Sequence, residues 1–142
     1  MIAAAQAAGD VLVVSDSREV VEFAARAGAE TIAEPPPGGL DAAAAAGIVG
    51  AGKWAVIHAD LPLVTPGDLR EVVGLLDGGA SVLAATHDGG TSLIGSHRPI
   101  EFAYGPASFR RHLARLPESK VLIRRAFLMD VDTADDVRRL LA

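Results

Sequence analysis

The chain has 142 residues, of which 50% are hydrophobic and 22% are charged, and its formal net charge is −5. This length fits one domain, and the composition excludes both an intrinsically disordered chain and a basic nucleic-acid-binding protein. The complete lack of cysteine excludes disulfides, thiolate metal sites and a cysteine nucleophile. With neither a basic leader at residues 1–6 nor an apolar run near the roughly 20 residues that span a bilayer, a single cytoplasmic domain over residues 1–142 is expected.

Short apolar strands alternate with helices along the chain. Residues 11–15 are rich in β-branched side chains, as expected for a buried parallel strand, and the apolar positions within residues 17–27 recur with helical spacing. Thr65 and Pro66 begin another helix, because threonine is a favoured N-cap and proline a favoured first helical residue. The other strands are expected at residues 31–33, 54–58, 81–86 and 91–95, with a strand-rich segment at 121–129, and the other helices at residues 41–49, 105–116 and 134–141. This alternation predicts the α/β class: a three-layer, mainly parallel sheet with helices on both faces.

Acidic residues follow two of the expected strands. Asp60 comes after residues 54–58, and Asp130 and Asp132 come after the last strand-rich segment. Ligands of open α/β sheets bind outside the carboxyl ends of the strands, so these carboxylates are expected to converge there. Carboxylates held that close need a bridging cation, and Mg²⁺ suits oxygen ligands completed by substrate phosphates. A purely structural role, in which these acids only end strands and cap helices, stays open at this point.

Two glycine-containing turns are candidate anion sites. Gly89 and Gly90 precede Thr91, and glycines before a hydroxyl residue allow the backbone to approach an anion closely. Gly105 and Ser108 belong to a Gly-Pro-x-Ser segment that begins a helix, where unpaired N–H groups can bind phosphate or carboxylate. An ordinary hairpin turn and ordinary helix capping explain the same residues. His58, on a strand, is interpreted as a core histidine with satisfied hydrogen bonds.

Several segments, taken in order, resemble one enzyme family, the guanylyltransferases of coenzyme F-420 biosynthesis that act on 2-phospho-L-lactate or phosphoenolpyruvate. The residues that carry the resemblance are EPPPGGL at 34–40, ADLPLVTPGDL at 59–69, Gly90-Thr91, YGPAS at 104–108 and DVDTADDV at 130–137. The segment at 59–69 is shared loosely with many nucleotidyltransferases, whereas its combination with the last two segments is more specific.

The resemblance implies one nucleotidyltransferase domain of the nucleotide-diphospho-sugar transferase type. It implies that GMP moves from GTP to the phosphate of phosphoenolpyruvate or 2-phospho-L-lactate, with release of pyrophosphate. Asp60 and Asp130 would be the catalytic magnesium ligands, with Asp132 as a supporting acid. Thr91, Gly105 and Ser108 match the family positions that hold the phosphate and carboxylate of the acceptor.

The sequence also departs from the family pattern. The family's first strand and its Val-Pro-x-Lys loop have no counterpart here, so the expected fold lacks that unit. Asp41 and Ser92 stand where the family has asparagine. Two alternatives therefore stay open: a non-catalytic or truncated remnant that binds an anion or a partner chain, and a molybdopterin-type nucleotidyltransferase with another acceptor. A missing central strand would expose sheet edges, which predicts a homodimer or a rearranged sheet.

Overall fold

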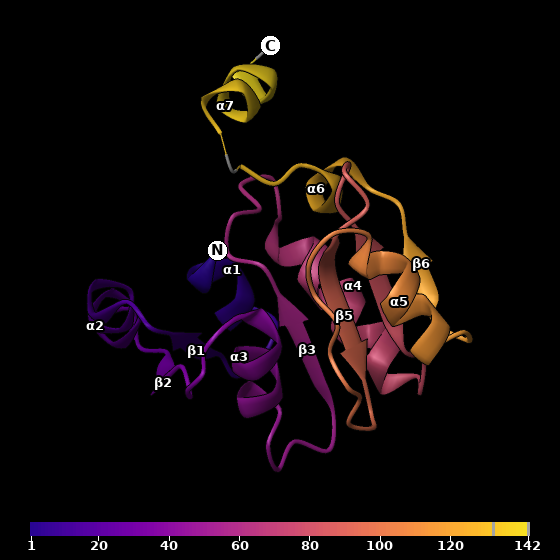
Figure 1. Cartoon of the computed structure of the whole chain (residues 1–142), viewed down its shortest axis with the longest axis horizontal. Helices are drawn as coiled ribbons and strands as arrows, with labels where there is room; N and C mark the ends of the chain where they lie inside the picture. The colour runs from indigo at the N-terminus through magenta and orange to yellow at the C-terminus, as the bar shows by residue number, and fades with distance from the viewer. Residues whose placement is uncertain (132, 142) are drawn as a thin grey trace.

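A computed structural model describes residues 1–131 and 133–141 (Figure 1). Helices and strands alternate along most of it. The N-terminal elements are α1 (Ile2–Gln6), β1 (Leu12–Ser15), α2 (Arg18–Arg26), β2 (Glu30–Ala33) and α3 (Leu40–Gly47). The central elements are β3 (Trp54–Ile57), α4 (Pro66–Asp77), β4 (Val82–Ala85) and β5 (Thr91–Ser96). The C-terminal elements are α5 (Ser108–Arg115), β6 (Lys120–Leu122), α6 (Arg125–Leu128) and α7 (Ala134–Leu141).

The strands form two sheets. β1 and β2 pair in parallel, and the second sheet has the order β3-β5-β4-β6. Within it β5 runs antiparallel to both β3 and β4, while β4 and β6 are parallel. The α/β class is confirmed, but the expectation of a mainly parallel sheet is wrong for this second sheet. The turn at residues 86–90 is too short for a crossover connection, so β5 must pair antiparallel to β4.

The core lies on both faces of the four-stranded sheet. Along β4, Val82 and Ala84 face one apolar cluster while Leu83 faces the other, as the alternation of a strand requires. Helices cover both faces, and Figure 1 shows α5 in front of this sheet and α4 behind it. One cluster contains Leu61, Val64, Leu69, Val72, Leu76, Val82, Ala84, Leu93 and Phe127. The other contains Ala44, Trp54, Leu83, Ile94, Phe102 and Leu116.

The strand-rich segment expected at 121–129 is only partly a strand. β6 ends at Leu122, and residues 125–128 form the short helix α6. The helical turn allows Phe127 to be fully buried while Leu122 and Ala126 pack against the same cluster, which strict alternation along a strand would prevent. Asp130 therefore follows a helix and not a strand.

The capping signals of the sequence are present at the helix that follows Asp60. Thr65 is the N-cap of α4, and its hydroxyl accepts the Asp68 N–H while the Asp68 carboxylate accepts the Thr65 N–H. This reciprocal cap fixes the start of α4 directly after the loop that carries Asp60. No helix in the described part of the chain combines the length and the apolar character needed to cross a membrane.

Candidate active site

The segments that carry Asp60 and Asp130 lie side by side. The Val131 N–H donates to the carbonyl oxygen of Asp60 over 3.1 Å. Asp130 is only 7% exposed, and Oδ1 of Asp60 is buried without a hydrogen-bond partner among the described residues. The two acidic segments therefore meet through their backbones, and α6 rather than a strand precedes Asp130. Asp132 lies outside the described residues, so its role as a supporting ligand stays a prediction.

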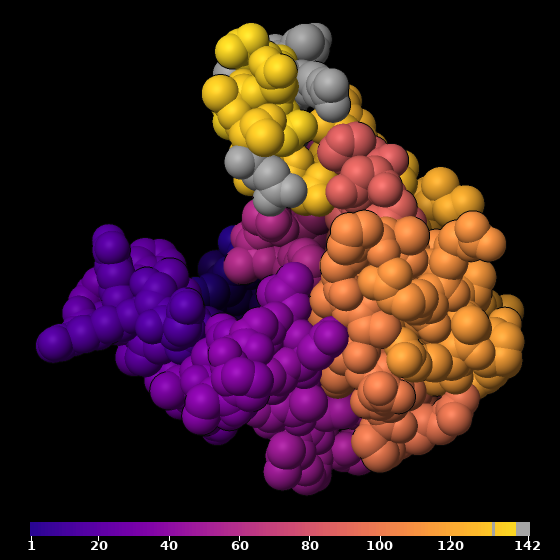
Figure 2. Space-filling model, in the orientation of Figure 1, coloured from indigo at the N-terminus to yellow at the C-terminus, as the bar shows by residue number. Residues whose placement is uncertain are grey.

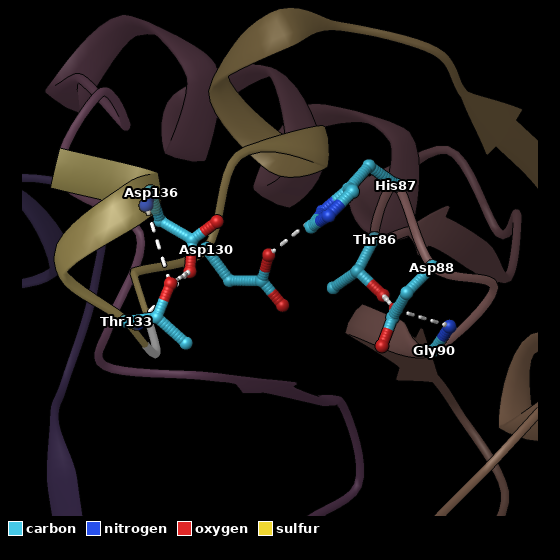
Figure 3. Close-up of polar contacts among 7 residues, drawn as sticks. All are labelled: Thr86, His87, Asp88, Gly90, Asp130, Thr133 and Asp136. Carbon is cyan, nitrogen blue, oxygen red and sulfur yellow. Dashed lines mark hydrogen bonds and ion pairs between the residues drawn. The ribbon is translucent and has the colours of Figure 1, made fainter. Parts of the chain in front are cut away.

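His87 contacts Asp130 from a third segment. Its Nδ1 lies 3.2 Å from Oδ1 of Asp130 (Figure 3). Its backbone N–H donates to the Leu128 carbonyl over 3.0 Å. The first contact orients the carboxylate, and the second ties the turn at residues 86–90 to the end of α6. No role of its own was expected for His87. The feature of the sequence that could have identified it is the position of a histidine in the glycine turn that follows a strand.

The turn that carries His87 is held by Asp88. Oδ1 of Asp88 accepts hydrogen bonds from the Thr86 hydroxyl and, over 3.1 Å, from the Gly90 N–H. These bonds favour the ionised form and lower the pKa of Asp88. A Cβ at Gly90 would lie 2.6 Å from Oγ1 of Thr86, so a side chain there would displace the turn.

Two of the acids that follow Asp130, Asp135 and Asp136, belong to the last helix. The Thr133 N–H and hydroxyl donate to Oδ2 of Asp136 over 2.9 Å and 2.7 Å, and the Asp136 N–H donates to Oγ1 of Thr133 (Figure 3). Asp135 pairs with Arg138 over 2.8 Å on the same helix. Asp130 thus contacts His87, while Asp136 caps α7.

Thr91 and Ser108 meet in a second, buried group. The Ser108 hydroxyl donates to Oγ1 of Thr91 over 3.2 Å, and Nδ1 of His112 lies 2.8 Å from the same oxygen. Both hydroxyl residues are 1% exposed and His112 is 0% exposed. The structure therefore brings together two of the predicted substrate residues, but their hydroxyls bond to the protein interior. His112 was missed, although it lies one helical turn after Ser108.

Gly105 lies in the loop in front of this group. The Ser108 N–H donates to the Gly105 carbonyl over 3.0 Å, and left-handed backbone angles occur at Gly105 (φ 102°) and at Ala107 (φ 56°). Gly105 and Ala107 are exposed, in contrast to Thr91 and Ser108. The part of this group that can meet a ligand is therefore the loop backbone and not the two hydroxyls.

Several buried polar atoms of the described residues have no hydrogen-bond partner. Among the described residues there are six such atoms: Nε2 of His58, Oδ1 of Asp60, the hydroxyl of Tyr104, and atoms of Trp54, Arg115 and Ser119. The His58 and Tyr104 rings pack with centroids 5.2 Å apart. Burial, and secondarily the charge of Asp41, raises the pKa of Tyr104, which keeps its phenol protonated. The interpretation of His58 as a satisfied core histidine is wrong for Nε2. Buried polar groups without partners are rare, which is typical of atoms that a ligand satisfies.

The donor set at Asp60 and Asp130 suits a hard cation. Both acids present carboxylate oxygens, and Asp60 has a buried oxygen with no other partner. No group of three or more His, Asp or Glu side chains that could hold a metal ion occurs in the described part of the chain. A magnesium ion held by two carboxylates would take its other ligands from substrate phosphates and water, which is its usual mode of binding.

Comparison with known proteins decides the family. The family model described as "Guanylyl transferase CofC like" matches residues 1–142.

The chain belongs to the guanylyl transferase CofC-like family.

Named relatives of this family differ in their substrate. The chain is 32% identical to the phosphoenolpyruvate guanylyltransferase of Sphaerobacter thermophilus, covering 96% of the chain and 72% of that protein. It is 28% identical to the 2-phospho-L-lactate guanylyltransferase of Methanocaldococcus infernus, covering 90% and 62%. It is 35% identical to the 3-phospho-D-glycerate guanylyltransferase of Phenylobacterium zucineum, covering 78% and 55%. The chain thus spans between 55% and 72% of the length of these three CofC-like relatives.

Solved structures agree with the fold. One is a Desulfovibrio desulfuricans G20 protein assigned as a nucleotide-diphospho-sugar transferase. It matches with a TM-score of 0.69 at 18% identity, over 93% of this chain and 65% of that one. A Mycobacterium tuberculosis H37Rv protein matches with a TM-score of 0.69 at 21% identity, over 99% and 80%. At these identities the likeness concerns the fold alone, and it supports the expected nucleotide-diphospho-sugar transferase-like architecture.

Proposed function

We propose that this CofC-like chain takes part in guanylyl transfer from GTP to the phosphate of a small phosphorylated three-carbon acid, with release of pyrophosphate. The observation that carries the proposal is the meeting of the Asp60 and Asp130 segments beside unpaired polar atoms of His58 and Tyr104. The named relatives act on phosphoenolpyruvate, 2-phospho-L-lactate and 3-phospho-D-glycerate. We propose phosphoenolpyruvate or 2-phospho-L-lactate as the acceptor, in deazaflavin coenzyme F-420 biosynthesis. A pterin acceptor has no comparable support.

In this proposal Asp60 and Asp130 hold Mg²⁺, which would neutralise phosphate charge. His87 fixes the orientation of the Asp130 carboxylate through the 3.2 Å contact. The protonated phenol of Tyr104 donates a hydrogen bond to the bound substrate. The loop around Gly105 binds the acceptor anion with its backbone N–H groups.

The chemical step needs no covalent enzyme intermediate. An oxygen of the acceptor phosphate attacks the α-phosphorus of GTP and forms the new P–O bond. The bond from that phosphorus to the oxygen bridging to the β-phosphate breaks, and pyrophosphate leaves with the electron pair. Positioning and electrostatics carry such a reaction, so the residues that orient the two substrates account for catalysis.

The experiment measures pyrophosphate release and the guanylylated product by mass spectrometry, with GTP, Mg²⁺ and each of the three acids. Asp60→Asn and Asp130→Asn should each lower kcat by about 100-fold or more, because each removes charge at the developing transition state. Asp135→Asn is the matched control, because this acid is exposed and pairs only within α7 in the described contacts. Normal turnover in either site variant would refute the metal assignment.

Calorimetry separates transfer from binding alone. Binding of phosphoenolpyruvate and Mg²⁺ without any transfer by the wild-type chain would identify an anion-binding protein and contradict the catalytic proposal. No binding of GTP or of any of the three acids by a folded sample would contradict the proposed function altogether.

We also propose a homodimer, supported by the position of β3 at the edge of its sheet. A cavity of about 370 Å³ borders this edge and is lined by residues of α1, β3 and α4, including Ala5, Trp54 and Leu69. Unpaired strand edges favour pairing with another chain. Light scattering at micromolar concentration tests this, and a monomer would contradict it.

A further inference from the structure

Two consecutive residues of α5 hold the same residue of the loop in front of it. His112 accepts the Ala103 N–H at Nε2 over 2.9 Å, from the buried side. Arg111 donates to the Ala103 carbonyl through Nη2 and Nε over 2.9 Å and 3.1 Å, from the exposed side. Both polar backbone groups of Ala103 are therefore bound by adjacent side chains of one helix.

The hydrogen bond from Ala103 determines the tautomer of His112. Because Nε2 accepts an N–H, the proton of the neutral ring must lie on Nδ1, which then donates to Oγ1 of Thr91. Burial, and secondarily the charge of Arg115, lowers the pKa of His112 to about 4, so the ring is neutral near pH 7. His112 thus joins the loop to Thr91 on β5 with one donor and one acceptor.

The hold extends along the loop to Tyr104. Arg111 also donates to the Tyr104 carbonyl over 3.0 Å, and Oδ1 of Asp41 accepts the Tyr104 N–H over 2.7 Å. Arg111 adds positive charge close to the turn, because its Nη2 would lie 3.7 Å from a Cβ at Gly105. No acceptor is bonded to the N–H groups of Gly105 and Ala107 within the part of the chain that the structure describes. Both residues have left-handed angles, and such unpaired N–H groups bind anions.

We propose that His112 and Arg111 form a two-sided clamp that preorganises the loop at residues 103–107 to bind the anionic acceptor. They act as positioning residues, because the loop backbone and not their side chains contacts the acceptor. This inference rests on the proposed function. A site that is already ordered loses less entropy on binding, so the clamp sets acceptor affinity more than the rate of the step that follows.

The clamp predicts a specific kinetic signature. Arg111→Met and His112→Leu should raise the KM for the acceptor acid by about 10–100-fold, with a smaller change in kcat and an unchanged KM for GTP. Arg110→Met is the matched control, because Arg110 is the exposed neighbour of Arg111 and its side chain makes no hydrogen bond or ion pair among the described residues. It should leave all three parameters unchanged.

Conservative variants separate the clamp from general stability. His112→Gln places an amide oxygen near Nε2, so it should restore part of the acceptor affinity that His112→Leu loses. Arg111→Lys keeps the charge but loses the pair of hydrogen bonds to the Ala103 carbonyl. It should therefore restore less acceptor affinity than a purely electrostatic role would allow. If His112→Leu fails to fold, the variants His112→Gln and Arg111→Met still give the comparison.

A measurement without turnover tests the same arrangement. Nitrogen-15 spectra of histidine-labelled protein should show a neutral His112 with its proton on Nδ1. A proton on Nε2, or a charged ring at pH 7, would overturn the clamp whether or not the chain transfers GMP. Acceptor KM values at wild-type level in both Arg111→Met and His112→Leu would overturn the clamp while leaving the proposed function intact. If none of the three acceptor acids binds to the wild-type chain, the proposed function fails. The nitrogen-15 spectrum then decides by itself whether His112 has the arrangement that the clamp requires.

Discussion

Residues 1–51 and residues 54–128 pack very differently. In the first region, the buried apolar side chains are the small ones of Ala24 and Ala44, while Phe23 is 59% exposed. In the second region, large side chains such as Phe127 and Leu83 are fully buried on opposite faces of the four-stranded sheet. Figure 2 shows the difference in shape, since α2 and the β1–β2 sheet project as a lobe at the left of the molecule.

This difference shows which part of the molecule supports the candidate site. Stabilisation by burial grows with the apolar area removed from water, so residues 54–128 supply most of it. Asp60, His87 and Thr91 all belong to that well-packed region. The N-terminal region contributes Asp41, whose bond to the Tyr104 N–H joins the start of α3 to the acceptor loop. These site residues therefore lie in the well-packed part of the chain, as precise positioning requires.

The largest test of this comparison is a matched pair of phenylalanines. Phe127→Ala should lower the free energy of unfolding by about 3–5 kcal/mol, because it leaves a cavity in the core. Phe23→Ala should change it by less than about 0.5 kcal/mol, because this ring is largely exposed. Urea denaturation measures both. A loss of similar size in the two variants would show that the N-terminal lobe is packed in solution, and the contrast between the regions would disappear.

A smaller effect is expected from glycines within the well-packed region. Gly90→Ala should cost about 1–3 kcal/mol, because the new Cβ meets Oγ1 of Thr86 at 2.6 Å. The displaced turn should also lower turnover, because it carries His87 away from Asp130. Gly74→Ala is the control: no atom lies within 4 Å of its Cβ in the middle of α4, so alanine should stabilise by about 0.4–1 kcal/mol. Thermal unfolding and turnover are measured for both variants. Equal unfolding temperatures and equal turnover in the two variants would contradict the close approach at Gly90.

The smallest expected effect is the loss of stability at acidic pH. The hydrogen bonds from Thr86 and Gly90 lower the pKa of Asp88 below its usual 3.8. The stability that this carboxylate contributes is therefore fully present above about pH 4 and is lost as the pH falls through the lowered pKa. Asp68 behaves alike: burial opposes the shift, but bonds from Thr65 and Arg124 lower its pKa overall.

The prediction is tested by measuring the midpoint of urea denaturation at several pH values between pH 5 and pH 3. Asp88→Asn keeps both hydrogen bonds but cannot titrate, so its midpoint should fall less steeply than that of the wild type. Identical slopes would remove Asp88 from the acid response.

Local features of the structure were predictable because their causes lie within a few residues. The N-cap at Thr65 and the strand that begins at Thr91 depend on neighbours along the chain. The hairpin interpretation of the glycine turn is confirmed by the antiparallel β4–β5 pair, whereas the mainly parallel sheet is wrong for the second sheet because alternation of strands and helices does not reveal pairing. The strand-rich interpretation of residues 125–128 is wrong because burial of Phe127 outweighs local strand preference. His58 was misjudged because periodicity places a side chain on a face but does not show whether its nitrogen has a partner.

The α/β class, the family and the acids that follow the ends of α6 and β3 could be predicted from the amino-acid pattern, because periodicity, caps and motif order are local properties. The packed molecule was needed to show that His87 contacts Asp130 across 43 residues and that His112 and Arg111 hold Ala103 from two sides. Such contacts depend on how the helices and strands pack, and packing joins residues that no local pattern relates.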